Sequence, residues 1–152
     1  MLDICPIINH QNIDMHTVLT YFTILLTSFF LQAQNTIEVS MTGFENNDGK
    51  AMVGLFIEEE TFLREPKITL SSEIVNHKSE VTFTDVPDGI YAISVYHDEN
   101  DNNKLDLIMG VLPKEDNGTS NNPESVLGPP KWKDSIFEIK GGEVKSFNIT
   151  ID

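Results

Sequence analysis

The chain has 152 residues, of which 39% are hydrophobic, enough for one domain with its own core. Its formal net charge of −14 argues against nucleic-acid binding, because that function needs a basic surface to neutralise phosphates. An acidic surface is compatible with cation binding and with an extracellular setting.

The first predicted element is an apolar run, Val18 to Leu31, interrupted only by threonine and serine and followed by a short polar segment. It predicts a secretory signal peptide over residues 1–34, cleaved near Ala33 or Gln34, although the usual basic residues before the run are missing. Met15 is an alternative start, and in that case residues 1–14 lie upstream of the signal peptide. An uncleaved anchor is the alternative, but the run is shorter than the roughly 20 residues that span a bilayer. We therefore expect export to the periplasm or cell surface, with no stable membrane span after cleavage.

The single cysteine, Cys5, precedes the apolar run. The domain predicted over residues 35–152 therefore has no disulfide, no thiol nucleophile and no thiolate metal ligand. Its stability must come from packing.

The predicted domain consists of short strands and turns. Most of the strands alternate apolar and polar side chains, while one, over residues 51–57, is apolar on both faces, as expected for a central strand. Asp48-Gly49 predicts a hairpin turn before that central strand. The alternating segments are residues 37–42, 81–84, 90–96, 135–139 and 144–151.

This rhythm predicts an all-β fold, a small antiparallel β-sandwich of about seven strands, with an open barrel as the alternative. Residues 109–134 do not fit the rhythm and are rich in proline, glycine and asparagine. We expect them to form one long loop, and loops of that length in compact domains tend to be functional or disordered.

The most informative motif follows the strand at residues 90–96. Oxygen-bearing side chains recur at every second position, so that Asp98, Asn100, Asn102 and Asp106 match positions 1, 3, 5 and 9 of a calcium loop. Lys104 stands at position 7, where the loop uses a backbone carbonyl. The spacing predicts a calcium site, because calcium takes six to eight oxygen ligands.

Two positions depart from that pattern. Asn103 replaces the usual glycine, although asparagine tolerates left-handed backbone, and Met109 replaces the closing glutamate. Glu115 or Asp116 would have to supply the missing ligand. The expected affinity is weak, about 10⁻⁴–10⁻³ M. The alternative is a solvated loop held by turns of its asparagines and aspartates.

Other chemistry is sparse. A hydrolase using His97, Asp98 and Glu115 is the alternative to a binding role, but successive residues of a strand point to opposite faces, and no catalytic motif accompanies His97. The long loop offers a second candidate surface. It consists of Ser120, Asn121, Asn122 and Trp132, although Trp132 is also suited to packing the loop onto the domain.

The run VPDGIYAISVYHDENDNNKLDLIMGVLPKEDNGTSNN, followed by GPPKWKDSIFEI, resembles the domain of unknown function 2141 family of exported bacterial proteins. The resemblance covers nearly the whole chain after residue 34. It implies an immunoglobulin-like or prealbumin-like sandwich, a signal peptide and a periplasmic or surface location, but no activity.

These features favour a non-catalytic binding or structural module of the bacterial envelope over an enzyme. Calcium is the expected cofactor, bound by the loop at residues 98–106. An envelope protein, a peptide or a glycan is the expected kind of partner.

Overall fold

The computed structural model describes residues 14–28, 34–109, 112–124 and 128–152. The chain divides into two compact units, residues 1–32 and 33–152. In the first, α1 spans Met15–Ser28. Within the described residues, no helix is both long and apolar enough to cross a membrane. The predicted cleavage position at Ala33 lies outside the described residues.

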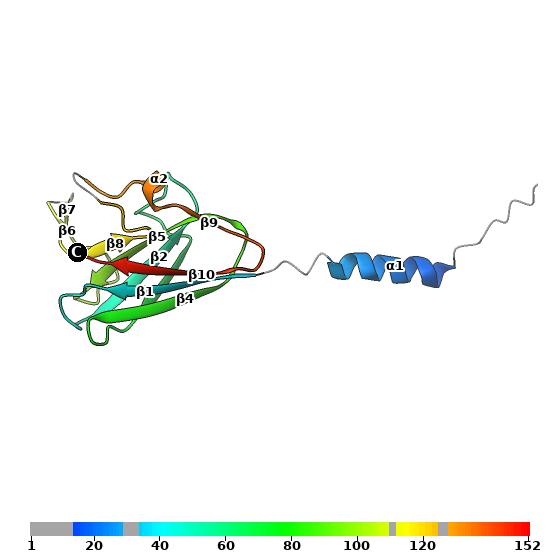
Figure 1. The fold of residues 1–152 in the computed structure, drawn as a ribbon, viewed down its shortest axis with the longest axis horizontal. Coiled ribbons are helices and arrows are strands. Elements are labelled where there is room, and N and C mark those ends of the chain that lie inside the picture. Colours follow the sequence, from blue (N-terminus) through cyan, green and yellow to red (C-terminus); the bar gives the residue numbers. More distant parts are fainter. Residues whose placement is uncertain (1–13, 29–33, 110–111, 125–127) are drawn as a thin grey trace, which may run out of the picture. The chain divides into compact units, whose positions relative to one another are not determined.

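The second unit is a β-sandwich, which confirms the predicted fold class (Figure 1). One sheet has the strand order β10-β1-β4, and the other has the order β3-β2-β5-β8, with β9 also paired to β5. β6 and β7 form a separate two-stranded hairpin. The strands are β1 (Asn35–Thr42), β2 (Lys50–Phe56), β3 (Ile68–Ser72), β4 (Lys78–Val86), β5 (Gly89–Asp98), β6 (Leu107–Ile108), β7 (Leu112–Pro113), β8 (Asn117–Thr119), β9 (Phe137–Ile139) and β10 (Val144–Thr150).

The main core lies between the two sheets because each strand turns its alternate apolar residues inward. In β1, Ile37, Val39 and Met41 are buried, and the intervening side chains are more exposed. The facing sheet contributes the buried side chains of Val53 in β2 and Ile93 in β5, among others.

A second, smaller core covers the outer face of β2. Phe56 and Ala92 pack there against Phe62, which belongs to the turn before β3. The indole of Trp132, in the short helix α2 (Trp132–Ser135), meets the Phe62 ring edge-on at a centroid distance of 5.5 Å. This second layer explains why β2 is apolar on both faces, and it gives Trp132 a packing role.

The connections differ from the predicted ones. Gly49 has the positive φ, +62°, expected of an Asp-Gly turn, but β1 and β2 belong to different sheets, so the turn is not a hairpin. The turn between β4 and β5 also crosses from one sheet to the other. The sandwich is not wholly antiparallel either, because β1 pairs with β10 in parallel.

The segment at residues 109–134 is more ordered than the predicted single loop. It contains β7, β8 and the start of α2. β8 pairs with the middle of β5 and therefore extends the larger sheet. Part of the predicted long loop therefore belongs to the larger sheet, through β8, and Trp132 packs into the second core.

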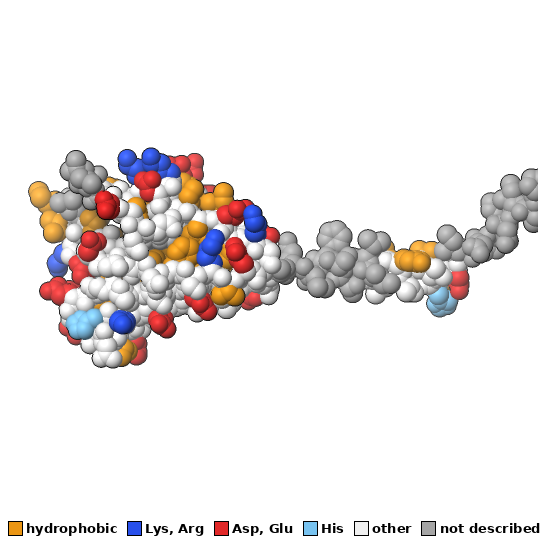
Figure 2. Space-filling view, in the orientation of Figure 1, with side chains coloured by type: hydrophobic (Ala, Val, Ile, Leu, Met, Phe, Trp, Pro, Cys, Tyr) orange, Lys and Arg blue, Asp and Glu red, His pale blue; other side chains and the backbone are white. Residues whose placement is uncertain are grey.

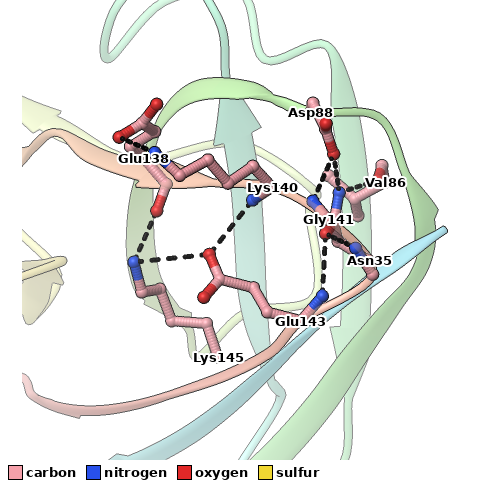
Figure 3. A network of polar contacts seen from close by, with 9 residues as sticks. Asn35, Val86, Asp88, Glu138, Lys140, Gly141, Glu143 and Lys145 are labelled. Atoms are coloured by element: carbon pink, nitrogen blue, oxygen red, sulfur yellow. Dashed lines mark hydrogen bonds and ion pairs between the residues drawn. The ribbon is translucent and has the colours of Figure 1, made fainter. Parts of the chain in front are cut away.

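One buried asparagine joins three parts of the chain at the end of the sandwich where β1 begins (Figure 3). The Asn35 amide nitrogen donates to the Val86 carbonyl at 2.8 Å and to Asp88 Oδ1 at 2.9 Å. Its amide oxygen accepts hydrogen bonds from the backbone N–H groups of Gly142 and Glu143, at 2.8 and 3.0 Å. Asn35 therefore fixes the start of β1 to the turn after β4 and to the turn before β10.

Candidate cation-binding loop

The candidate site is the acidic loop that begins at the last residue of β5. Asp98 is fully buried, and its carboxylate accepts hydrogen bonds from the backbone N–H groups of Asn102, at 2.9 Å, and Asn103, at 2.8 Å. The loop can close around Asp98 because Asp101 and Asn103 take positive φ values of 58° and 62°. Asn103 thus adopts the backbone that glycine supplies in a calcium loop.

The alternate polar residues of the loop converge on Asp106. The amide nitrogen of Asn100 donates to Asp106 Oδ2 at 2.7 Å, and that of Asn102 donates to Asp106 Oδ1 at 3.1 Å. The amide oxygen of Asn102 accepts a hydrogen bond from the Lys104 N–H at 2.8 Å. The structure therefore brings the side chains of Asn100 and Asn102 together at the Asp106 carboxylate.

Glu115 closes the group from the segment after β7. Its Oε2 accepts a hydrogen bond from the Asp106 N–H at 3.0 Å, and the Lys114 N–H donates to the Asp106 carbonyl at 2.8 Å. The Glu115 side chain is only 7% exposed. Its Oε1 atom is buried and, among the described residues, has no hydrogen-bond partner. An unsatisfied buried carboxylate oxygen is costly unless a cation or another donor completes it.

The negative charge of the site affects the pKa of the neighbouring Tyr96 phenol. Burial, followed by the negative charges of Asp98 and Glu115, raises the pKa of the Tyr96 phenol to about 12. Both carboxylates therefore act on the same phenol, although one belongs to β5 and the other to the segment after β7. Ionisation of the phenol is disfavoured first because the group is buried and second because it would add a negative charge beside two others.

Lys50 provides the positive charge beside this group. It is the first residue of β2 and lies opposite Asp98 in the β2–β5 register. Its ammonium is 4.0 Å from Asp98 Oδ2 and forms an ion pair with Asp101. The sequence gives no local signal for this role, because only the pairing of the strands brings Lys50 to the loop.

His97 faces away from the acidic group. It is 1% exposed, its Nε2 lies 2.8 Å from the Asp48 carbonyl oxygen, and its ring meets that of Phe44 edge-on. Within the described part of the chain, the imidazole forms no hydrogen bond with Asp98 or Glu115. The structure thus separates His97 from the two carboxylates that the alternative hydrolase would need.

The second candidate surface is largely structural. Ser120 is fully buried, where its hydroxyl accepts a hydrogen bond from the Ile93 N–H at 2.9 Å and donates to the Ser135 carbonyl. Ser120 therefore ties β5 to α2 and contributes nothing to an exposed surface.

The neighbouring asparagines are exposed but also hold chain segments together. The Asn121 amide nitrogen donates to the carbonyls of Asp134 and Ile136, at 3.2 and 3.0 Å. That of Asn122 donates to the Asn148 carbonyl at 2.8 Å. These contacts join the end of β8 to α2 and to β10.

In the described part of the chain, no three histidine, cysteine, aspartate or glutamate side chains form a metal-binding group. Calcium, however, also takes amide and backbone oxygens. The loop is rich in such oxygens, from Asn100, Asn102 and the Lys104 carbonyl. The geometry therefore fits a hard cation better than a transition metal.

The fold and the loop together define a small β-sandwich protein with an acidic, oxygen-rich loop at one end. A family model described as "Uncharacterized protein conserved in bacteria (DUF2141)" matches residues 39–146. The chain belongs to this family, which confirms the predicted resemblance. Comparisons with curated proteins and with solved structures give no match.

Proposed function

We propose that this protein is an exported, non-catalytic binding or structural module of the bacterial envelope whose loop at residues 98–106 binds calcium together with Glu115. One observation carries the calcium proposal. The Glu115 carboxylate reaches the loop from outside it, with one oxygen on the Asp106 N–H and the other buried and unpartnered among the described residues. It replaces the glutamate that a calcium loop usually carries at its end.

The ligands would come from side chains of the loop and from Glu115. The carboxylates of Asp98, Asp106 and Glu115 provide negative charge, and the amides of Asn100 and Asn102 turn toward the same point. These amides direct nitrogen toward Asp106. Calcium binding would require each amide to rotate and present its oxygen. Those oxygens accept backbone hydrogen bonds, from the Asn102 N–H to Asn100 at 3.1 Å and from the Lys104 N–H to Asn102 at 2.8 Å.

An ion at this position would hold the base of the β6–β7 hairpin. Asp106 immediately precedes β6, and Glu115 is the second residue after β7. The side chains of Leu107, Ile108 and Met109 are exposed, and apolar side chains appear at this end of the domain in Figure 2. Calcium would therefore fix how the hairpin is presented at the surface.

Calorimetric titration and thermal melting test this proposal on the full protein. With a dissociation constant of about 10⁻⁴–10⁻³ M, calcium at about 10 mM is expected to stabilise the fold by about 1.4–2.7 kcal/mol relative to chelator. Hydrogen exchange at residues 105–109 and 114–116 should slow in parallel. The calcium proposal fails if calcium at that concentration produces neither heat nor a change in melting temperature.

The non-catalytic role is supported by the separation of His97 from the carboxylates. A general base must lie within hydrogen-bond reach of the proton that it takes. The His97 ring is instead enclosed between the turn before β2 and Phe44. No observation in the described part of the chain favours the hydrolase.

Export makes a separate prediction about the mature N-terminus. Asn35 is buried and forms four hydrogen bonds, so the domain requires the chain from Asn35 onward. We expect the mature protein, purified from the periplasm or cell surface of a bacterial host, to begin at Gln34 or Asn35. Intact mass and N-terminal sequencing measure this directly. Recovery of uncleaved chain in the cytoplasm alone would contradict export.

A further inference from the structure

Lys50 is held against the acidic loop by the turn that precedes it. A Cβ atom added to Gly49 would lie 1.9 Å from the Asp98 carbonyl oxygen, so the backbone of the turn lies directly on that of Asp98. The Asn46 amide also donates to Glu99 at 2.6 Å. The turn and the loop are therefore packed as one unit, and β2 begins from a fixed point.

The Lys50 side chain extends from this fixed point toward two carboxylates. It is 22% exposed, whereas the Asp98 side chain is wholly buried and the Asp101 side chain is 68% exposed. Among the ion pairs of the described residues, only those of Lys50 reach the loop. A buried carboxylate needs such a compensating charge in addition to its hydrogen bonds.

We propose that Lys50 is the resident counter-cation of this site: it keeps the loop folded without calcium and, by repelling the incoming ion, lowers the affinity for it. This inference rests on the proposed calcium site, because Asp98 is both the partner of Lys50 and the first ligand of the loop. The same ammonium thus has opposite effects on the metal-free and the calcium-bound protein.

The effect on stability without calcium and the effect on calcium affinity can be measured separately. Both follow from the charge of Lys50, so an uncharged side chain of similar shape should remove both. Two cations that share the Asp98 carboxylate repel each other, and the repulsion is larger when one of them is divalent. Removal of the ammonium is therefore expected to strengthen calcium binding about tenfold. It should also lower the melting temperature in chelator, because Asp98 and Asp101 then lose their common partner.

The test uses Lys50→Met, which keeps most of the aliphatic stem, and Lys50→Gln as a second uncharged variant. Lys50→Arg retains the charge and should bind calcium like the wild type. Lys145→Gln removes one positive charge at the other end of the sandwich, beside Glu143, and is the matched control for net charge (Figure 3). Calcium affinity is measured by calorimetry, and stability by melting in chelator.

The expected result is tighter calcium binding in both uncharged variants, with no such gain in Lys50→Arg or Lys145→Gln. If the wild type binds calcium and the uncharged variants bind it equally or more weakly, the role of Lys50 is overturned while the site stands. If neither the wild type nor any variant binds calcium, the calcium site itself is overturned.

Discussion

Replacement of Glu115 by glutamine is expected to weaken calcium binding about a hundredfold. Substitution of outer-shell partners alone costs about 10–100-fold in metal affinity, and Glu115 is proposed as a direct ligand. Glutamine has nearly the same shape and keeps an oxygen that can accept the Asp106 N–H, so the fold should survive. Calorimetric titration measures the loss.

The same variant has a second, opposite readout. In chelator, Glu115→Gln should be as stable as the wild type or more stable, because it removes a buried charge that has one unpartnered oxygen among the described residues. The control is Glu138→Gln, which removes an exposed carboxylate paired with Lys140 at 3.2 Å. It should change neither calcium binding nor stability appreciably. Unchanged calcium affinity in Glu115→Gln would contradict the proposed ligand.

Replacement of Asn35 by alanine is expected to destabilise the domain by about 4 kcal/mol, because the partners of a fully buried side chain lose their hydrogen bonds together. Alanine leaves the N–H groups of Gly142 and Glu143 without their acceptor, and the Val86 carbonyl without its donor. Melting in denaturant measures the change. A loss of this size corresponds to about 15 °C in melting temperature.

Asn148→Ala is the matched control, because Asn148 is an exposed asparagine in β10. It should cost less than about 0.5 kcal/mol. If Asn35→Ala were equally mild, the network in Figure 3 would not be what holds this end of the sandwich together.

The strands could be predicted because apolar and polar residues alternate along a strand that has one buried face. Ile37, Val39 and Met41 are spaced by two, and all three are buried in β1. The sheet to which each strand belongs could not be predicted in this way. A turn such as Asp48-Gly49 shows that the chain changes direction, but a hairpin and a crossing between sheets use the same residue types.

The inner set of loop residues could be predicted for the same reason, since alternate positions of a tight loop point the same way. The sequence also placed Glu115 among the nearest candidates to close the loop, and the structure shows it bonded to Asp106. Lys50 could not be found, because its position opposite Asp98 depends on the register of two strands. The residues next to Lys50 and Asp98 in the sequence do not indicate how β2 and β5 are aligned.

The partners of buried polar residues could not be predicted from the sequence. Ser120 was expected at a surface, since a serine among asparagines and glycines is typical of a solvated loop. Its hydroxyl instead satisfies backbone groups of β5 and α2 inside the domain. Local sequence gives the hydrogen-bonding capacity of such a side chain, but its partners come from distant segments.

The parallel pairing of β1 with β10 has a consequence for how the domain is made. Thr36 lies opposite Val144, 108 positions later (144 − 36 = 108). During synthesis β1 can pair with β4, but its other edge stays open until β10 has emerged, and contacts so distant along the chain form slowly. The smaller sheet would therefore remain incomplete until most of the chain has been synthesised. The export proposed above would require the chain in this incomplete form.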